Sequence, residues 1–525
     1  MSSPQANRAS LARNVVISSP LGPGVFRLRS GRYRETLGQP FQFDLELQSD
    51  DTAIDLEGLL GKPLTVKVKG LDGGERFFSG LVRTADQGGE EDQLGLYRLS
   101  VVPWISLLQL GSDCRIYQEK TCLEIVEQVF EDCGFADFET HALIGRYEPL
   151  PYCVQYNESH FDFVHRVLQA AGVYYYHQHG DGAHKLVLCD APSVHKPFPG
   201  HARIPFRSLR NNALVEEHIH ALRVRQEMQP VGYATRDYDY TDPKADLEAT
   251  GKASHSYPCG SLEQFEYPGG FGVAADRDAI AKTRLAESEC RSLEISGAAY
   301  SWGLSVGSVF SLDHYPRRDR NRSYLTTSID LVIGRSTDDD SGADREAAGT
   351  FNYCCDFTAI PSDVQFRPAR TVKRPVIAGV QPALVVAPTG QDEKTPYTDK
   401  FASAKVQFYW DRKGKNDETS SCWLRCAHFS AGNGWGSVFL PRVGGEVAVA
   451  FVDGDPDRPM ILGHLYNGDN ATPLSLDKES RRSVIKDDVG NYLFMSSADG
   501  HEAVRIHTAR NDMYWAIGRP SQKPD

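Results

Sequence analysis

Histidine gives the sequence its first candidates for chemistry. His177, His179 and His184 surround a Gly-Asp-Gly turn, and His218 and His220 lie two residues apart on one predicted strand. The imidazole nitrogen is a common metal ligand, so either group could bind a metal ion. Neither group has a carboxylate or a cysteine arranged with it. We therefore expect the first group to form an exposed polar hairpin, and we predict no metal or cofactor from either.

A run of aspartates offers a second candidate. Asp453, Asp455 and Asp457 have the spacing of the first half of a calcium-binding loop. The sixth position of such a loop needs glycine and the twelfth needs glutamate, but here they are Arg458 and His464. The pattern therefore favours a tight acidic turn between two strands.

One serine lies in the pattern of a hydrolase nucleophile, Gly303-Leu-Ser-Val-Gly307. That pattern works where a strand turns sharply into a helix. Here the next residues, Ser308 to Leu312, are typical of a strand, which favours a structural turn. The sequence holds no other catalytic constellation, no phosphate-binding loop and no dinucleotide fingerprint. It predicts no catalytic residue and a protein that is not an enzyme.

The cysteines are best explained by packing. There are eleven, an odd number, and they are scattered; two of them are the adjacent pair Cys354-Cys355. Cys422 and Cys426 are four apart on a predicted strand and face the same side, which favours packing over metal binding. The distribution indicates reduced thiols in a protein made in the cytoplasm.

Length and charge narrow the class. A chain of 525 residues is too long for one core and predicts three or four domains. The formal net charge of −13 argues against wrapping nucleic acid or lying on an anionic membrane. The N-terminus lacks an apolar segment and no run of about 18 apolar residues occurs, so we expect no signal peptide and no membrane helix.

The stretch 405–470 predicts a small closed barrel. Val406, Phe408 and Trp410 alternate with other residues at strand spacing. Further short strands are predicted around Trp423, at 438–439, at 447–451 and at 460–462, with Gly, Asp, Asn and Pro between them. Five short strands in this length indicate an OB-type barrel. Trp410, Trp423 and Trp435 could stack on nucleic-acid bases, but the acidic residues around them favour core and trimer-contact roles.

The preceding part of the chain is rich in strands with a few helices. Alternating apolar residues predict strands over 14–110, most clearly at 41–47. Helices are predicted at 121–134 and 159–172, each with a polar N-cap and a closing glycine, and at 274–295. The polar run 335–349 predicts an exposed or mobile loop.

Four blocks of the barrel stretch carry a resemblance. They are Val-Gln-Phe-Tyr-Trp-Asp-Arg (406–412), Ser-Ser-Cys-Trp-Leu-Arg (420–425), Trp-Gly-Ser-Val-Phe-Leu-Pro-Arg (435–442) and Gly-Asp-Pro-Asp-Arg-Pro (454–459). In this order and spacing they resemble VgrG, the valine–glycine repeat spike protein of bacterial type VI secretion systems, whose barrel also occurs in tailed-phage spikes. The segments 153–159, 184–190, 307–312 and 366–368 resemble the hub half of the same family.

The resemblance implies a mainly β fold with a few helices. It comprises a disordered N-terminus (1–13), a phage hub-like region of two related barrels with helical insertions (14–375) and an OB-fold barrel (376–470). A linker (471–482) and the start of an intertwined β-helix spike (483–525) follow. Strands are predicted at 483–487, 492–495, 503–507 and 514–517. One such strip cannot bury both faces alone, so its stability implies a homotrimer. The long needle of the family is not in this sequence, so we expect a shortened chain or a short natural spike.

The function implied is mechanical. The family's spike caps a tube, punctures target envelopes and delivers effectors, and it leaves the cell through the machine without a signal peptide. The implied partners are an Hcp-type tube protein, a PAAR-type tip protein with effectors, and baseplate components. Trp423, Trp435, Pro441, Gly445 and Asp455 are expected at packing and turn positions. The alternatives are the hub–spike of a phage-like contractile particle, a toxin-bearing enzyme of the family and an OB-fold nucleic-acid binder.

Overall fold

The computed structural model describes residues 15–70, 74–208, 216–253, 255–258, 262–270, 277–334, 353–392 and 395–518. The chain forms two compact units. The first holds Met1–Ser112, Lys120–Pro149 and Glu158–Lys373, and the second holds Asp113–Glu119, Leu150–Asn157 and Arg374–Asp525. The N-terminus 1–13, expected to be disordered, and the predicted loop 335–349 lie outside the described residues.

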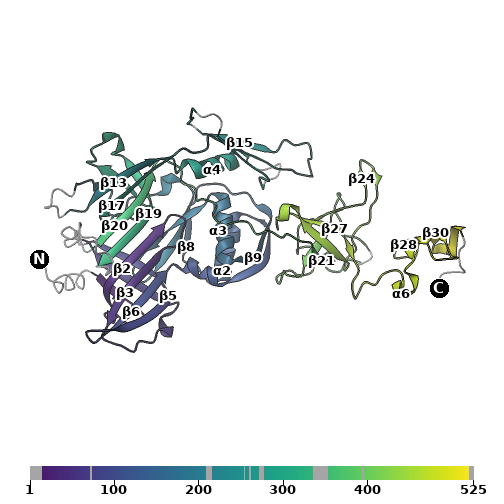
Figure 1. Cartoon of the computed structure of the whole chain (residues 1–525), viewed down its shortest axis with the longest axis horizontal. Helices are drawn as coiled ribbons and strands as arrows, with labels where there is room; N and C mark the ends of the chain where they lie inside the picture. Colours follow the sequence, from purple (N-terminus) through teal and green to yellow (C-terminus); the bar gives the residue numbers. More distant parts are fainter. Residues whose placement is uncertain are drawn as a thin grey trace. The chain divides into compact units, whose positions relative to one another are not determined.

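A sheet of twelve strands dominates the first unit (Figure 1). Its main order is β1-β4-β5-β6-β3-β2-β19-β20-β17-β13, and β18 pairs with β19 and β12. The strands are β1 Val15–Ser18, β2 Arg27–Thr36, β3 Gln42–Ser49, β4 Pro63–Lys69, β5 Glu75–Glu91, β6 Leu94–Val102, β12 Arg203–Pro205, β13 His218–Gln226, β17 Leu293–Tyr300, β18 Val309–Asp313, β19 Ser323–Gly334 and β20 Tyr353–Pro361. The N-terminal strands β1 to β6 and the later strands β12 to β20 meet where β2 runs antiparallel to β19. The two curled halves are therefore one continuous sheet.

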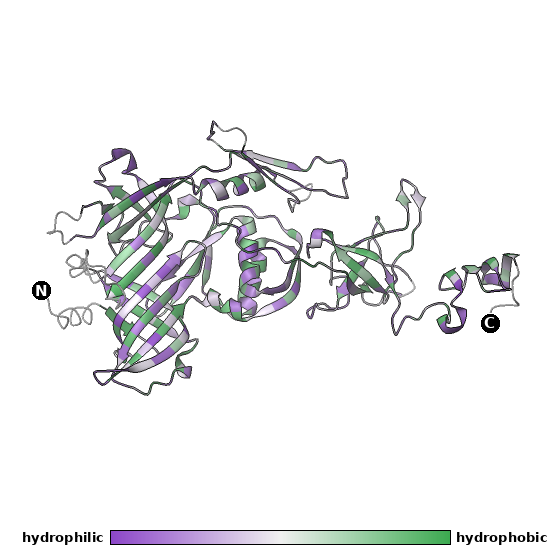
Figure 2. Ribbon diagram, in the orientation of Figure 1, coloured by the Kyte–Doolittle hydropathy of each residue, from purple (hydrophilic) through white to green (hydrophobic). Residues whose placement is uncertain are grey.

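The apolar alternation explains how this sheet makes a core. Along β3, Phe43, Leu45 and Leu47 are buried and the residues between them are not, as the sequence predicts. Figure 2 shows the same alternation of green and purple across the neighbouring strands. One face of the sheet thus supplies most of the unit's largest apolar cluster.

Two helices in the first unit follow from local signals. Helix α2 (Cys122–Asp132) begins at a capping box in which Thr121 and Glu124 bond reciprocally. Helix α3 (His160–Ala171) begins at Ser159 and ends at Gly172, whose φ of 71° is the left-handed conformation that glycine adopts readily. Both confirm the sequence prediction. The small sheet β10-β11-β8 (Tyr174–His179, His184–Cys189, Phe138–Ala142) belongs to the same unit.

The third predicted helix is shorter than expected. Helix α4 spans Arg277–Glu289, not 274–295, and residues 274–276 lie outside the described residues. Leu293 and Ile295 instead begin β17, because they pair with β13, and Ile295 also pairs with β20. Tertiary pairing has overridden helical periodicity there. Helix α4 contacts a sheet of order β15-β14-β16 (Glu248–Lys252, Gly232–Arg236, Glu263–Glu266).

The second unit contains the predicted barrel. Its strand order is β22-β21-β26-β27-β23, with bounds Lys405–Phe408, Gln381–Val386, Glu446–Phe451, Pro459–Leu465 and Arg425–Cys426. Val406, Phe408, Val447 and Val449 are among its buried core. The ribbon β7–β9 (Ser112–Lys120, Leu150–Ser159), from the first third of the chain, also contributes, because Ile116 and Tyr156 pack against this core.

Two further parts complete the second unit. A hairpin of β24 (Ala431–Gly432) and β25 (Trp435–Gly436) extends from the barrel (Figure 1). We call residues 429–439 the arm. Helix α6 (Leu476–Glu479) is followed by β28 Arg482–Lys486, β29 Tyr492–Ser496, β30 Ala503–Thr508 and β31 Met513–Gly518, paired antiparallel in that order. We call β28 to β31 the strip; its strands lie where the sequence predicts them.

The sequence prediction was wrong about one barrel strand. Val438 and Phe439 lie in no strand and are exposed, although their apolar character favoured one. Short 3-10 helices complete the described structure, at Glu57–Leu59, Trp104–Leu110, Pro192–Val194, Arg318–Arg320, Val452–Gly454 and Arg510–Asp512. Across the described ranges, no helix has the length and apolar content needed to span a membrane.

Candidate functional site

The three clustered histidines lie inside the first unit. His177 and His184 are only 3% and 6% exposed, so the predicted exposed hairpin is wrong. The ring of Phe41 packs against all three imidazoles, with centroids 4.9 Å from His177, 4.9 Å from His179 and 5.6 Å from His184. The hairpin β10–β11 is polar in sequence, but its histidines face the aromatic interior of the large sheet.

Hydrogen bonds engage these imidazoles. Glu35 Oε1 lies 2.9 Å from Nδ1 of His177 and accepts the backbone N–H of the same residue. Tyr33 donates its hydroxyl to Glu35 and lies 2.9 Å from Nε2 of His179. Nε2 of His184 accepts the backbone N–H of Trp104. His177 Nε2 is buried without a hydrogen-bond partner.

Burial controls protonation in this cluster. It lowers the pKa of His177, His179 and His184 to about 3 and raises the pKa of the Glu35 carboxyl. All three imidazoles are therefore neutral at physiological pH. Within the described ranges, no three His, Cys, Asp or Glu side chains form a group that could hold a metal ion. The cluster is a buried polar network that joins β2 to β10.

The second histidine pair does not share a regular strand face. A β-bulge between Ile219 and Ala221 interrupts the alternation of β13 at His220. The ring of His220 stacks on Tyr300 at 4.6 Å, and Nδ1 of His218 lies 2.9 Å from the carbonyl oxygen of Glu216. These contacts give both residues packing roles.

The serine of the nucleophile pattern lies in a connecting turn. Residues 301–308 link β17 to β18, and β18 is a strand rather than the helix that a nucleophile elbow requires. Gly307 has a φ of 77° and lies against the ring of Tyr176. Gly307 thus fits a tight turn rather than a nucleophile elbow.

The aspartates form a latch within the second unit. Asp455, which is buried, pairs with Arg374. The Asp457 carboxylate accepts a hydrogen bond from the backbone N–H of Val154 at 2.7 Å. The carbonyl oxygen of Gly454 accepts one from the backbone N–H of Ile377 at 2.8 Å. The predicted acidic turn therefore binds two separate stretches of the chain, residues 374–377 and the β7–β9 ribbon. We call this turn, residues 453–458, the aspartate latch.

The barrel tryptophans have different environments. Trp410 stacks on Phe408 at 4.9 Å and donates its indole N–H to Gln381. Trp423 packs against Tyr397, with Lys405 over its ring. Trp435 in the arm is 68% exposed, so it does not lie in the core, and the trimer-contact role expected for it stays a prediction.

The other predicted barrel positions are packing sites, with one correction. Pro441 is buried, and the carbonyl oxygen of Gly445 accepts the Val385 N–H. Cys422 precedes the two-residue strand β23 rather than sharing a strand with Cys426. Burial raises the pKa of the two thiols, to about 12 and about 11, so both remain protonated. They pack against the barrel core.

The largest uncovered apolar surface of the strip is one face of its sheet. The register places Ile485, Leu493, Ile506 and Trp515 in one row, and Met495, Val504 and Ile517 in another row on the same side. All seven are exposed large apolar residues. We call them the strip face. The opposite side is self-packed, with Tyr492 stacked on His507 at 4.5 Å and Arg505 over Tyr514.

Comparisons with known proteins assign both units. Residues 34–337 match the family "Phage tail baseplate hub (GPD)", and residues 399–466 match "Type VI secretion system/phage-baseplate injector OB domain". The chain is 35% identical over 511 residues to the Pseudomonas aeruginosa type VI secretion system spike protein VgrG1b, covering 96% of this chain and 68% of that protein. VgrG1a of the same organism is 34% identical, with 95% of this chain and 78% of that protein covered.

Solved structures show the same fold at low sequence identity. An Escherichia coli type VI secretion component, described as similar to the phage T4 tail proteins gp27 and gp5, has a TM-score of 0.58 at 20% identity. That comparison covers 84% of this chain and 97% of the other. The Francisella PdpA–VgrG complex in its lidded form gives a TM-score of 0.62 at 9% identity, covering 96% and 79%. The chain therefore belongs to the VgrG family and is a structural hub and spike component of a type VI secretion system.

Proposed function

We propose that three copies of this chain wrap around a common axis, cap a secretion tube and puncture the target envelope to deliver effectors. The observation that carries the proposal is the strip face. It presents seven large apolar side chains to solvent on a strip that is already fully paired between its own strands.

The strip face needs a covering surface. Burying one large apolar side chain stabilises by roughly 1.5–3 kcal/mol, so covering all seven is worth on the order of 10 kcal/mol. Three strips that turn these faces inward would bury them along one axis. A β-helix wound from three chains has this geometry, and it leaves few exposed strand edges to peel during penetration.

The continuous sheet of the first unit supports a role at the base. It has two curled halves, joined where β2 pairs with β19. We propose that these are two related barrels, so that three copies present six similar surfaces to an Hcp-type tube protein. Baseplate components would bind around the sides. A PAAR-type tip protein and effectors would bind beyond the strip, and the assembled spike would leave the cytoplasm through the machine itself.

The corresponding division of the chain is part of this proposal. It comprises a hub region of 14–375, a barrel of 376–470 and a spike that begins at 483. One finding favours an alternative in the same mechanical class, because both matching family descriptions also name phage baseplates. The alternative is the hub–spike of a phage-like contractile particle. Genes for sheath, tube and tail fibres beside this one would favour the particle, and genes for a type VI membrane complex would favour secretion.

Light scattering on the purified chain tests the assembly. We expect a mass of three times 58.2 kDa, because association of three chains would remove the apolar strip face from water. A chain that stays at 58.2 kDa across the accessible concentration range would overturn the three-copy assembly. Co-purification with a tube protein then tests the base contact separately.

A further inference from the structure

The arm is too small to be stable as a free hairpin. Its ladder consists of two residue pairs, Ala431 with Gly436 and Gly432 with Trp435. Bonds between Ser430 and Ser437 close its base. Isolated two-stranded hairpins are marginally stable in water even when they are longer. A hairpin of this length therefore calls for a surface that holds it.

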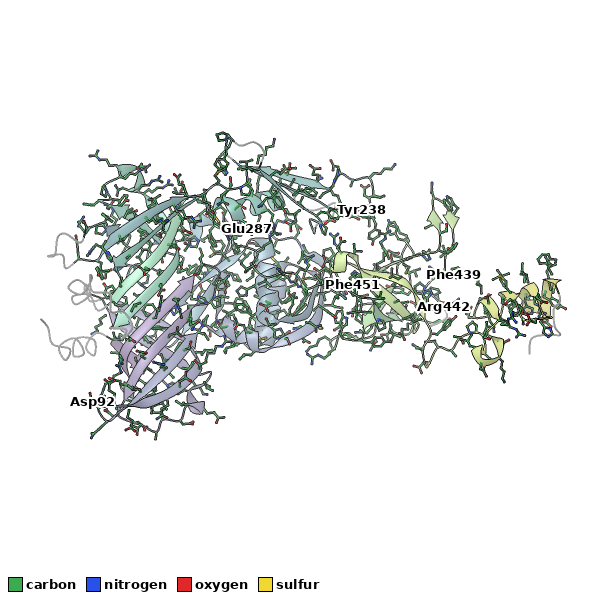
Figure 3. All side chains as sticks on the ribbon, in the orientation of Figure 1. Asp92, Tyr238, Glu287, Phe439, Arg442 and Phe451 are labelled. Atoms are coloured by element: carbon green, nitrogen blue, oxygen red, sulfur yellow. The ribbon has the colours of Figure 1, made fainter. Side chains whose placement is uncertain are left out.

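Apolar side chains dominate the exposed surface of the arm. Phe429 is 98% exposed and Trp435 is 68% exposed, and Val438 and Phe439 are exposed as well. Figure 1 shows β24 standing away from β21 and β27, and Phe439 is labelled in Figure 3 where the chain returns towards the barrel. Aromatic residues in such numbers on a protruding element are typical of an interaction surface.

A second apolar surface lies on the barrel of the same unit. Phe408 pairs with Ala383, which pairs with Val447, and this row is buried in the barrel. Side chains alternate along strands, so the next row has the opposite orientation. It consists of Gln407, Leu384, Glu446 and Leu465, of which Gln407 is buried, Leu384 is half-buried and Leu465 is exposed. Tyr409, in the turn after β22, is 61% exposed. We call Tyr409, Leu384 and Leu465 the wall.

The arm and the wall are two different surfaces on one unit. When two different surfaces of identical chains bind each other, the contact is head-to-tail and can close into a ring. We propose that the arm of one copy docks on the wall of the next copy, so that three arms fasten the barrels in a closed ring. This inference rests on the proposed three-copy assembly and specifies a contact within it.

The connection between arm and strip supports a second copy as the occupant. Arg442, three residues after Phe439, pairs with Asp488 in the turn between β28 and β29, with Nη2 and Oδ1 3.2 Å apart. Both ends of this ion pair lie in the second unit. Covering the strip face with other copies therefore brings their barrels close to the arm. A cargo protein on the arm would require no such link.

Photo-crosslinking tests the docking in the full chain. Trp435 is replaced by p-benzoylphenylalanine, and the purified protein is irradiated and separated under denaturing conditions. We expect adducts of two and three chains, with crosslinks mapping to 381–386, 405–409 or 459–465. Adding Tyr409→Ser and Leu465→Ser should reduce adduct yield at least about tenfold. The same photoreactive residue in place of Phe265, an exposed aromatic of β16, is the control and should give few adducts.

Each outcome separates the two proposals. A three-chain mass with no crosslink from the arm, or with crosslinks confined to one chain, overturns the docking and leaves the assembly standing. Crosslinks from the arm to the strip or to the first unit of another copy overturn the wall as the receiving surface. A single-chain mass overturns the assembly and the docking together. The docking is also overturned if Tyr409→Ser with Leu465→Ser keeps a normal circular dichroism spectrum and gives the same adduct yield as the unchanged wall.

Discussion

The large sheet of the first unit and the strip of the second unit treat their side chains in opposite ways. The sheet covers its own apolar face and encloses even polar groups, as Glu35 and His177 show. The strip pairs each of its strands with a neighbour and yet leaves Ile506 and Trp515 exposed. Strand pairing alone therefore does not make a β structure self-sufficient. The sheet covers its apolar core with residues of its own chain, and the strip leaves its apolar face without such cover.

Lowering the pH should destabilise the large sheet, and this is the largest effect that we expect. The three buried imidazoles have folded pKa values of about 3, below the ordinary value of 6.5, so the unfolded chain binds protons more readily. Their stabilisation is complete above pH 6.5 and declines as the pH falls towards 3. At pH 5 each contributes a loss of about 2 kcal/mol, or roughly 6 kcal/mol together.

Other charged groups adjust the size of this loss. Glu35 has a raised pKa, so its protonation favours the folded state at low pH and offsets part of the loss. The Arg76 side chain lies nearby and opposes added positive charge. Hydrogen exchange during urea unfolding at pH 7.5 and 5.0 measures the effect on peptides of β2 and β10. His177→Gln should remove about a third of the pH dependence, and Gln178→Ala, which removes an exposed side chain of the same strand with no ionisable group, should leave it unchanged. Equal pH dependence in both variants would contradict the network's role.

Removing the central acceptor of the network should have the next largest effect. Glu35→Ala leaves the backbone N–H and the ring of His177, and the hydroxyl of Tyr33, without their acceptor. We expect the free energy of unfolding of the first unit to fall by about 3–5 kcal/mol. Asp330→Ala is the control, because it breaks a more exposed ion pair with Arg32 and should cost under about 1 kcal/mol. Similar losses in both variants would mean that the network adds nothing beyond an ordinary surface pair.

Charging the strip face should break the assembly without unfolding the sheet. Leu493 and Ile506 pair directly across two strands. Leu493→Lys with Ile506→Lys places like charges opposite each other on the strip face. We expect at least about 3 kcal/mol of lost association, which moves the mass in light scattering from three chains towards one. Val489→Lys with Leu476→Lys adds equal charge at exposed apolar residues outside the strip face, and the mass should not change. An unaltered mass in the first pair would show that another surface holds the copies together.

Local signals in the sequence were sufficient for part of this structure. The caps at Thr121 and Ser159 fixed two helix starts, and the alternation around Phe43 fixed a strand, because the deciding contacts are a few residues apart. The burial of His177 was not predictable in this way. It depends on Glu35, 142 residues earlier in the chain. The polar hairpin carries no sign of that partner.

In the second unit, too, contacts between distant parts of the chain could not be predicted from local sequence. The ribbon that brings Ile116 and Tyr156 to the barrel core comes from within the first third of the chain, and neither residue differs from an ordinary strand residue in its own segment. Trp435 was expected in a core or a trimer contact and Phe439 in a barrel strand, but both are exposed in the single chain. The surface that we propose for them belongs to another copy. Patterns of apolar residues predict which side chains will be buried. They do not predict whether the packing surface comes from the same chain or from another copy.

In the aspartate latch, the second unit pairs polar groups within its own chain, as the large sheet does. Breaking the latch should have the smallest of the effects that we predict. Asp457→Ala removes the acceptor of the Val154 N–H and should free the β7–β9 ribbon at a cost of about 1–2 kcal/mol. Hydrogen exchange of the amides at 150–157 should rise, and the mass in light scattering should stay the same. Asp453→Gly is the matched control, because Asp453 is exposed with a φ of 54° that glycine accepts without strain. If the ribbon exchanged no faster in Asp457→Ala than in this control, the apolar contacts of Ile116 and Tyr156 alone would hold it. The internal stability of the second unit would then come from apolar burial, which is also what we propose to hold the strips of different copies together.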